Sequence, residues 1–243
     1  MRGSTGYLVA YNGLLAAVWA AALAQALGAA AQKRALSVAM PAALPTVVLA
    51  QSLALLEPLH ALLGVVRSNP ATSLLQWSGR ALVLFPTLLA HPEVRLSAPA
   101  HRHTASLTRS SGAPPSQLQA RSEAGVLALA WSSIEILRYP QYALSLLGAC
   151  PFALSWLRYS GFIPLYPVGF LMEALLLRLV TNLGLERGGL FTLRMPNRLN
   201  FSFDFTFVAG LYPLMYPPVF YILFSHMLTQ RQKKLAQAKR SCA

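Results

Sequence analysis

Tyr166 and Glu173 lie seven residues apart in the apolar stretch 156–177. Seven residues of α-helix make roughly 700° of turn, so both side chains return to nearly one face, about 10 Å apart along the axis. The stretch is long enough to cross a bilayer, which takes about 20 residues. A carboxylate inside a membrane span is costly and by default marks a functional site. Two proton-transfer groups on one face therefore predict acid–base chemistry within the membrane.

Glu173 has no cation three or four residues away on its own predicted helix. We therefore expect either a partner from another helix or a glutamic acid kept neutral by desolvation. Pro167 and Gly169 follow Tyr166 closely and are expected to loosen the helix and open room for a ligand.

The composition indicates what kind of scaffold must position this pair. Of 243 residues, 55% are hydrophobic and 11% are charged, and the mean hydropathy is +0.48. Soluble domains carry about 25% charged residues, so the chain is predicted to be an integral membrane protein. The net charge of +13 sits in loops and a C-terminal tail. That distribution is typical of a protein facing anionic lipid and argues against nucleic acid as a partner.

Several other chemistries find no support in the sequence. Cys150 and Cys242 give neither a disulfide framework nor metal-ligand spacing. No glycine-rich phosphate loop is present. A thiol phosphatase would need an arginine six residues after its cysteine, and Trp156 occupies that position after Cys150. We therefore expect no metal and no cofactor.

The apolar runs predict an all-α fold, a single polytopic membrane helical bundle covering residues 1–243 with about six transmembrane helices. The turn-like residues 68–70 and the pair Cys150-Pro151 separate neighbouring spans. Polar residues 91–123 read as a flexible loop, 181–204 as a connection and 229–243 as a basic tail. The predicted spans are 7–31, 44–66, 71–90, 124–147, 152–180 and 205–228.

The first span lacks a convincing cleavage site and is read as a membrane helix rather than a removed signal peptide. Six spans place both termini on one side of the membrane. The basic tail indicates that this side is the cytosol, although cations in the opposite loops weigh against it.

Two further carboxylates lie inside predicted spans, each with a cation or histidine three residues on. These are Glu57 with His60, and Glu135 with Arg138. Residues at this spacing share a helix face, so both pairs are read as charges that stabilise the bundle. The second pair, with Tyr139 beside it, equally suits a cleft. A proton path through the buried glutamates, as in a small transporter, is a less favoured alternative.

Four stretches carry a resemblance to a known family. The chain resembles the very-long-chain (3R)-3-hydroxyacyl-CoA dehydratases, also called protein tyrosine phosphatase-like proteins, and the last stretch looks most like plant members. The stretches are LEPLHALLGVVRSNPATSLLQWSGR (56–80), AWSSIEILRYPQYAL (130–144), WLRYSGFIPLYPVGFLME (156–173) and RMPNRLNFSFDF (194–205).

The resemblance implies a hydro-lyase of the endoplasmic reticulum membrane with cytosolic termini. Such an enzyme removes water from (3R)-3-hydroxyacyl-CoA to give trans-2-enoyl-CoA, the third step of fatty-acid elongation. It would work beside an elongase, a ketoacyl reductase and an enoyl reductase. The family's catalytic tyrosine and glutamate map onto Tyr166 and Glu173. Beyond what the resemblance implies, we assign supporting or substrate-binding roles to Glu135, Arg138, Tyr139, Arg158, Tyr159 and Gly169. We expect Arg138 and Arg158 to hold the thioester or the CoA phosphates if they lie near the mouth of the cleft.

The sequence departs from the family pattern at Pro140, at Pro164 and in the length of the loop 91–123. These departures support an alternative in which the chain is a catalytically weak membrane scaffold that binds elongation or signalling partners. Dehydration of substrate would separate the enzyme from the scaffold.

Overall fold

The computed structural model describes residues 2–89, 121–193, 195 and 201–241. Within these residues the chain is helical, and extended backbone pairs only in an isolated bridge between Leu193 and Phe203. The predicted all-α class is therefore confirmed. The elements are α1 Arg2–Lys33, a short 3-10 helix η1 Leu36–Val38, α2 Ala39–Ala54, α3 Leu56–Leu62, α4 Pro70–Leu82, a π-helical segment η2 Val83–Leu89, α5 Ser122–Leu146, α6 Phe152–Arg187 and α7 Phe205–Ser241.

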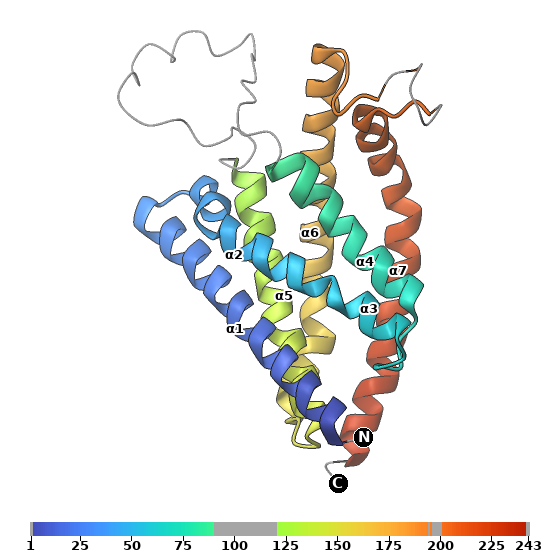
Figure 1. Ribbon diagram of the computed structural model, residues 1–243. Coiled ribbons are helices and arrows are strands. Elements are labelled where there is room, and N and C mark those ends of the chain that lie inside the picture. The colour runs from blue at the N-terminus through green and yellow to red at the C-terminus, as the bar shows by residue number, and fades with distance from the viewer. Residues whose placement is uncertain (1, 90–120, 194, 196–200, 242–243) are drawn as a thin grey trace.

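The bundle is built around α5, which packs against α1, α2 and α6, while α7 packs along α6. Helix α1 begins, and α7 ends, at the end of the bundle where α5 passes into α6 (Figure 1). The core between these helices is apolar and includes Trp19 of α1, Leu127 of α5 and Leu176 of α6.

The outer surface of the bundle is apolar as well. Large side chains such as Leu14, Leu171 and Phe207 are exposed, and contiguous apolar surface of this kind suits lipid rather than water. The molecule is a membrane protein on these grounds. Four helical segments of the described chain are long and apolar enough to cross a bilayer: Thr5–Lys33, Leu36–Leu62, Phe152–Arg187 and Phe205–Leu235.

Helix boundaries follow local chemistry. The Asn69 side chain accepts a hydrogen bond from the Ala71 backbone N–H at 2.9 Å, and Pro70 occupies the first turn, so α4 begins at the predicted turn. Pro151 precedes α6, as the predicted break requires, and Gly188 in the left-handed conformation (φ 72°) ends it.

Three predicted boundaries are wrong. The predicted span 44–66 is divided between α2, which begins earlier at Ala39, and α3, which ends at Leu62. Helix α6 continues past residue 180 to Arg187, and the Thr181 hydroxyl donates to the Leu177 carbonyl of the same helix at 2.9 Å. Helix α7 continues through the basic tail to Ser241, since Gln, Lys, Ala and Arg are strong helix formers. The predicted loop 91–123 lies outside the described residues except for its last three.

Pro140 in α5 and Pro164 and Pro167 in α6 all lie inside continuous helices. Membrane helices tolerate such residues because neighbouring groups satisfy the freed carbonyls. The departures from the family pattern therefore leave the helices that carry Tyr166 and Glu173 intact.

Candidate active site

Glu173 is held at the meeting point of three helices. Its Oε1 accepts a hydrogen bond from the Trp131 indole N–H of α5 at 2.8 Å. Its Oε2 accepts one from the Tyr216 hydroxyl of α7 at 2.9 Å. Both donors are neutral and buried, with 3% and 6% of their surface exposed, whereas Glu173 itself is only partly buried. The hydrogen-bond partners of this carboxylate therefore come from other helices, and neither of them is a cation.

The ring of Tyr166 lies in an aromatic row between α6 and α7. Its centroid is 5.8 Å from that of Phe170, 5.4 Å from Phe220 and 6.2 Å from Phe224. Within the described residues the Tyr166 hydroxyl makes no hydrogen bond, although Glu173 lies near enough to influence it electrostatically. The ring is therefore fixed by stacking while its hydroxyl keeps both its donor and its acceptor capacity.

Gly169 lies between Tyr166 and Glu173 on α6, three residues after the first and four before the second. It is buried, yet a Cβ placed there would meet no atom within 4 Å. Residues at these spacings share a helix face. The face that carries the two candidate catalytic groups thus has free space beside it, in agreement with the room expected near Gly169.

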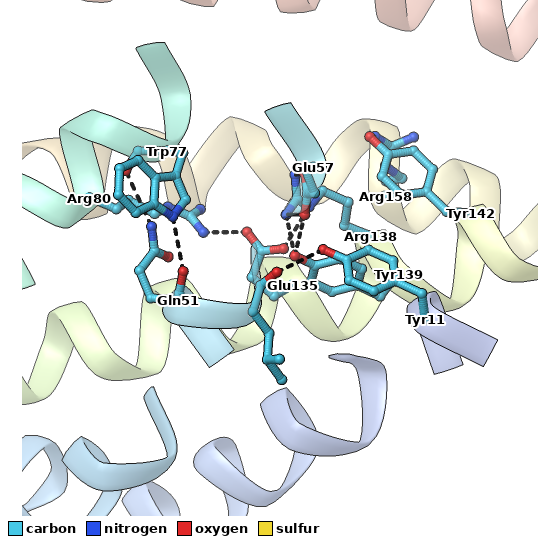
Figure 2. Close-up of polar contacts among 11 residues, drawn as sticks. Tyr11, Gln51, Glu57, Trp77, Arg80, Glu135, Arg138, Tyr139, Tyr142 and Arg158 are labelled. Carbon is cyan, nitrogen blue, oxygen red and sulfur yellow. Dashed lines mark hydrogen bonds and ion pairs between the residues drawn. The ribbon is translucent and has the colours of Figure 1, made fainter. Parts of the chain in front are cut away.

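Next to this face lies a chain of four alternating charges. Arg138 Nε donates to Glu135 Oε2 at 2.6 Å, and its two terminal nitrogens donate to the Glu57 carboxylate at 2.8 and 3.1 Å. Arg80 donates to the other oxygen of Glu135, and the Tyr139 hydroxyl donates to Glu57. Figure 2 shows these side chains converging from α3, α4 and α5.

The four-charge chain is electrically balanced, with two carboxylates and two guanidinium groups. Glu135 is 1% exposed, and a buried carboxylate is tolerated only when it is paired and hydrogen-bonded. The predicted Glu135–Arg138 pair is confirmed. These groups are fully engaged with one another and position the helices around the site.

Arg80, one end of the four-charge chain, is connected to Glu173 through the Trp131 indole. Its guanidinium carbon lies 5.6 Å from the centre of the Trp131 ring, within the range of a cation–π contact. Because the same indole donates to Glu173, Trp131 lies between the charge chain and the candidate catalytic carboxylate.

The predicted pairing of Glu57 with His60 is wrong. His60 Nε2 lies 2.8 Å from the Tyr7 hydroxyl, and its ring packs edge-on against Tyr7 and Tyr11 of α1. Arg138 offers Glu57 two parallel N–H donors, a bidentate geometry that a single imidazole nitrogen cannot match.

Arg158 and Tyr159 lie near the start of α6, where the Tyr142 ring separates Arg158 from Arg138 of the four-charge chain. Arg158 donates to Gln141 Oε1 at 2.8 Å and to the Tyr142 and Tyr159 hydroxyls at 2.8 and 3.0 Å. The centre of the Tyr142 ring lies 4.4 Å from the Arg158 guanidinium carbon and 5.9 Å from that of Arg138, and Figure 2 labels all three side chains. Of the two arginines expected to meet substrate, Arg138 is therefore neutralised and Arg158 is not.

Trp131 and Tyr216 were not identified from the sequence. They lie 42 and 43 residues from Glu173 along the chain. No spacing rule connects residues so far apart, and buried aromatic residues are common in helical bundles.

The chain is similar in sequence to a known protein family. The sequence model of the family described as protein tyrosine phosphatase-like protein, PTPLA, matches residues 51–237. No solved structure matches the chain significantly.

Three named relatives illustrate the range of organisms. The chain is 35% identical to the very-long-chain (3R)-3-hydroxyacyl-CoA dehydratase PASTICCINO 2 of Arabidopsis thaliana over 79% of this chain and 76% of the relative. It is 30% identical to very-long-chain (3R)-3-hydroxyacyl-CoA dehydratase 2 of Homo sapiens over 97% and 83%, and 34% identical to a Caenorhabditis elegans dehydratase of the same description over 94% of both chains. The chain belongs to the protein tyrosine phosphatase-like family, whose named relatives are very-long-chain (3R)-3-hydroxyacyl-CoA dehydratases.

Proposed function

We propose that this protein dehydrates very-long-chain (3R)-3-hydroxyacyl-CoA to trans-2-enoyl-CoA, with Tyr166 and Glu173 as the acid–base pair. The relatives' names supply the reaction. The observation that carries the proposal for this chain is the three-helix setting of Glu173, a carboxylate fixed by two neutral donors beside the open space at Gly169.

The reaction needs one base and one acid. A proton leaves C2, whose acidity the thioester raises, the C3–O bond breaks, and the departing hydroxyl takes up a proton to become water. Glu173 accepts hydrogen bonds on both oxygens, so it is oriented as an acceptor and takes the C2 proton. Tyr166, with its unengaged hydroxyl, donates to the departing oxygen. Return of the proton from Glu173 to Tyr166 restores both groups.

The membrane setting suits the substrate. A very long acyl chain is as apolar as lipid and can lie against the aromatic row of Tyr166, Phe170, Phe220 and Phe224 between α6 and α7. We propose six crossings, with α4–η2 and α5 joining the four apolar segments, since the charges of α4 and α5 neutralise each other. The protein would lie in the endoplasmic reticulum membrane with cytosolic termini, beside the other elongation-cycle enzymes.

The test is turnover of a long-chain (3R)-3-hydroxyacyl-CoA by the purified protein in detergent, followed by formation of the conjugated enoyl thioester. Tyr166→Phe and Glu173→Gln should each lower kcat by roughly 100-fold or more, as loss of a general acid or base does. Tyr221→Phe on α7 and Glu186→Gln on α6 are matched controls at exposed residues and should retain activity.

Two outcomes would contradict the proposal. A folded wild-type protein that is inert while a relative is active in the same assay would favour the membrane scaffold. Full activity of Glu173→Gln would remove this carboxylate from the chemistry.

A further inference from the structure

Arg158 differs from Arg80 and Arg138 in having only neutral partners. Its three hydrogen bonds go to an amide and two phenols, and its guanidinium lies 4.4 Å from the Tyr142 ring and 4.9 Å from the Tyr159 ring. Among the described residues no carboxylate lies within ion-pair distance of it, whereas Arg80 and Arg138 both contact Glu135. Its charge is therefore held in place without being neutralised.

The guanidinium retains donors for a further ligand. An arginine carries five N–H donors, and the three hydrogen bonds of Arg158 use two of them on Nη1 and one on Nη2. The Nε–H and one Nη2–H remain. A rigid cation with free donors is the arrangement that binds phosphate oxygens well.

A second cation lies at the same level of the bundle. Arg231 of α7 donates to the Ser160 hydroxyl, two residues after Arg158, at 3.3 Å. The exposed Lys233 and Lys234 follow on α7. This is the end of the bundle at which α6 begins and α7 ends (Figure 1), so positive charge gathers at one end of the α6–α7 pair.

The distance from Arg158 to the candidate active site matches the reach of a pantetheine arm. Arg158 precedes Tyr166 by eight residues and Glu173 by fifteen, which is about 12 and 22 Å along a helix axis. From its sulfur to its phosphate a pantetheine arm has thirteen bonds, as many as about four residues of extended backbone, and so spans roughly 15 Å. A phosphate at Arg158 therefore places the thioester beside the Tyr166–Glu173 face.

We propose that Arg158, fixed between Tyr142 and Tyr159, binds the phosphates of the substrate's CoA. This inference rests on the proposed dehydratase function. CoA enters at the end of the bundle that holds both termini, and the acyl chain extends from there between α6 and α7. Arg138, neutralised by Glu57 and Glu135, takes no part in holding the phosphates.

The experiment compares two substrates with the same acyl chain, a 3-hydroxyacyl-CoA and the corresponding 3-hydroxyacyl-pantetheine, which lacks every phosphate. Arg158→Gln should lower kcat/KM for the CoA substrate roughly 10- to 100-fold, the effect of losing hydrogen bonds to a charged group. The loss should be mainly in KM, because the phosphate contact is made in the ground state and the transition state alike. For the pantetheine substrate the variant should match wild type.

Arg158→Lys keeps the charge and should recover part of the loss, while Arg178→Gln, an exposed arginine on the same helix, should behave as wild type with both substrates. Equal losses on CoA and pantetheine substrates would show that Arg158 is only a structural link between α5 and α6, and would overturn the inference. The inference would also be overturned if Arg158→Gln kept the wild-type ratio of kcat/KM between the CoA and pantetheine substrates but was no longer stabilised against thermal unfolding by phosphatidic acid. That result would assign the site to a lipid headgroup. An inert wild type would instead reject the proposed function itself.

Discussion

The indole N–H of Trp131 donates to Glu173 Oε1 at 2.8 Å, and the Arg80 guanidinium lies 5.6 Å from the same indole ring. A single aromatic side chain thus links a buried charge chain to the carboxylate proposed to accept the substrate's proton. Orientation of that carboxylate depends on groups from α4, α5 and α7, although the residue itself is on α6.

Replacing Trp131 tests this link. Trp131→Phe keeps an aromatic ring but removes the donor to Glu173, so kcat should fall roughly 10-fold, in the range for a hydrogen bond to a charged group. KM should change little, since the acyl chain and CoA are held elsewhere. Steady-state kinetics beside Trp156→Phe, an exposed tryptophan of α6, checks the effect. A kcat equal to wild type would mean that Glu173 is oriented without the indole.

Tyr216→Phe removes the second donor and should lower kcat by a similar factor. The ring still packs against Phe170, whose centroid is 3.9 Å away, so the packing is preserved. Because both donors act on one carboxylate, we expect the two substitutions to be coupled in a double-mutant cycle. Strict multiplication of the two single effects would indicate that the donors act independently.

Gly169 offers a steric test of the space beside the pair. Gly169→Ala meets no atom within 4 Å and should not lower the unfolding temperature, whereas Gly169→Leu should fill the space and lower kcat/KM roughly 100-fold by displacing substrate. Gly28→Ala, in α1 and also without a neighbour within 4 Å, is the control for the effect of a methyl group in a helix. Full activity of Gly169→Leu would place the reacting carbons elsewhere.

The four-charge chain predicts a large effect on stability. Glu135→Ala leaves Arg80 and Arg138 without their shared carboxylate and should lower the free energy of unfolding by about 3–5 kcal/mol. The measurement is denaturant-induced unfolding in mixed micelles, followed by tryptophan fluorescence. A loss of unfolding free energy smaller than that of the control variant Glu123→Ala would mean that water or lipid replaces the Glu135 carboxylate.

The control is Glu123→Ala, which breaks a more exposed ion pair with Arg121 at the start of α5 and should cost about 0–1 kcal/mol. Hydrogen bonding to Arg121 lowers the pKa of Glu123. The small contribution of this pair is therefore present above the unfolded pKa of glutamate and is lost as the pH falls through the lower, folded value.

What the sequence could reveal depended on the distance between partners along the chain. The Glu135–Arg138 pair and the shared face of Tyr166 and Glu173 follow from helix geometry alone, because residues three and seven apart meet on one side of a helix. Helix starts at Asn69 and Pro151 likewise follow from local backbone chemistry.

Contacts between helices could not be derived in this way. Arg80 and Glu135 lie 55 residues apart and Arg138 and Glu57 81 residues apart. The spacing of three residues on one helix face pairs Glu57 with His60. That spacing carries no information about Arg138, a stronger donor on another helix. Trp131 and Tyr216 could not be identified as partners of Glu173 for the same reason, because they lie on other helices, 42 and 43 residues away along the chain.

The four-charge chain also has a consequence for biosynthesis. Glu57 and Arg80 emerge from the ribosome before α5, yet their hydrogen-bonded charge partners within the described residues, Glu135 and Arg138, are both on α5. Segments made first therefore wait with uncompensated charges, which are costly within a membrane. Insertion of α5 neutralises these charges. Pairing with Glu57 and Arg80 therefore favours the one rotation of α5 about its own axis that turns Glu135 and Arg138 toward them.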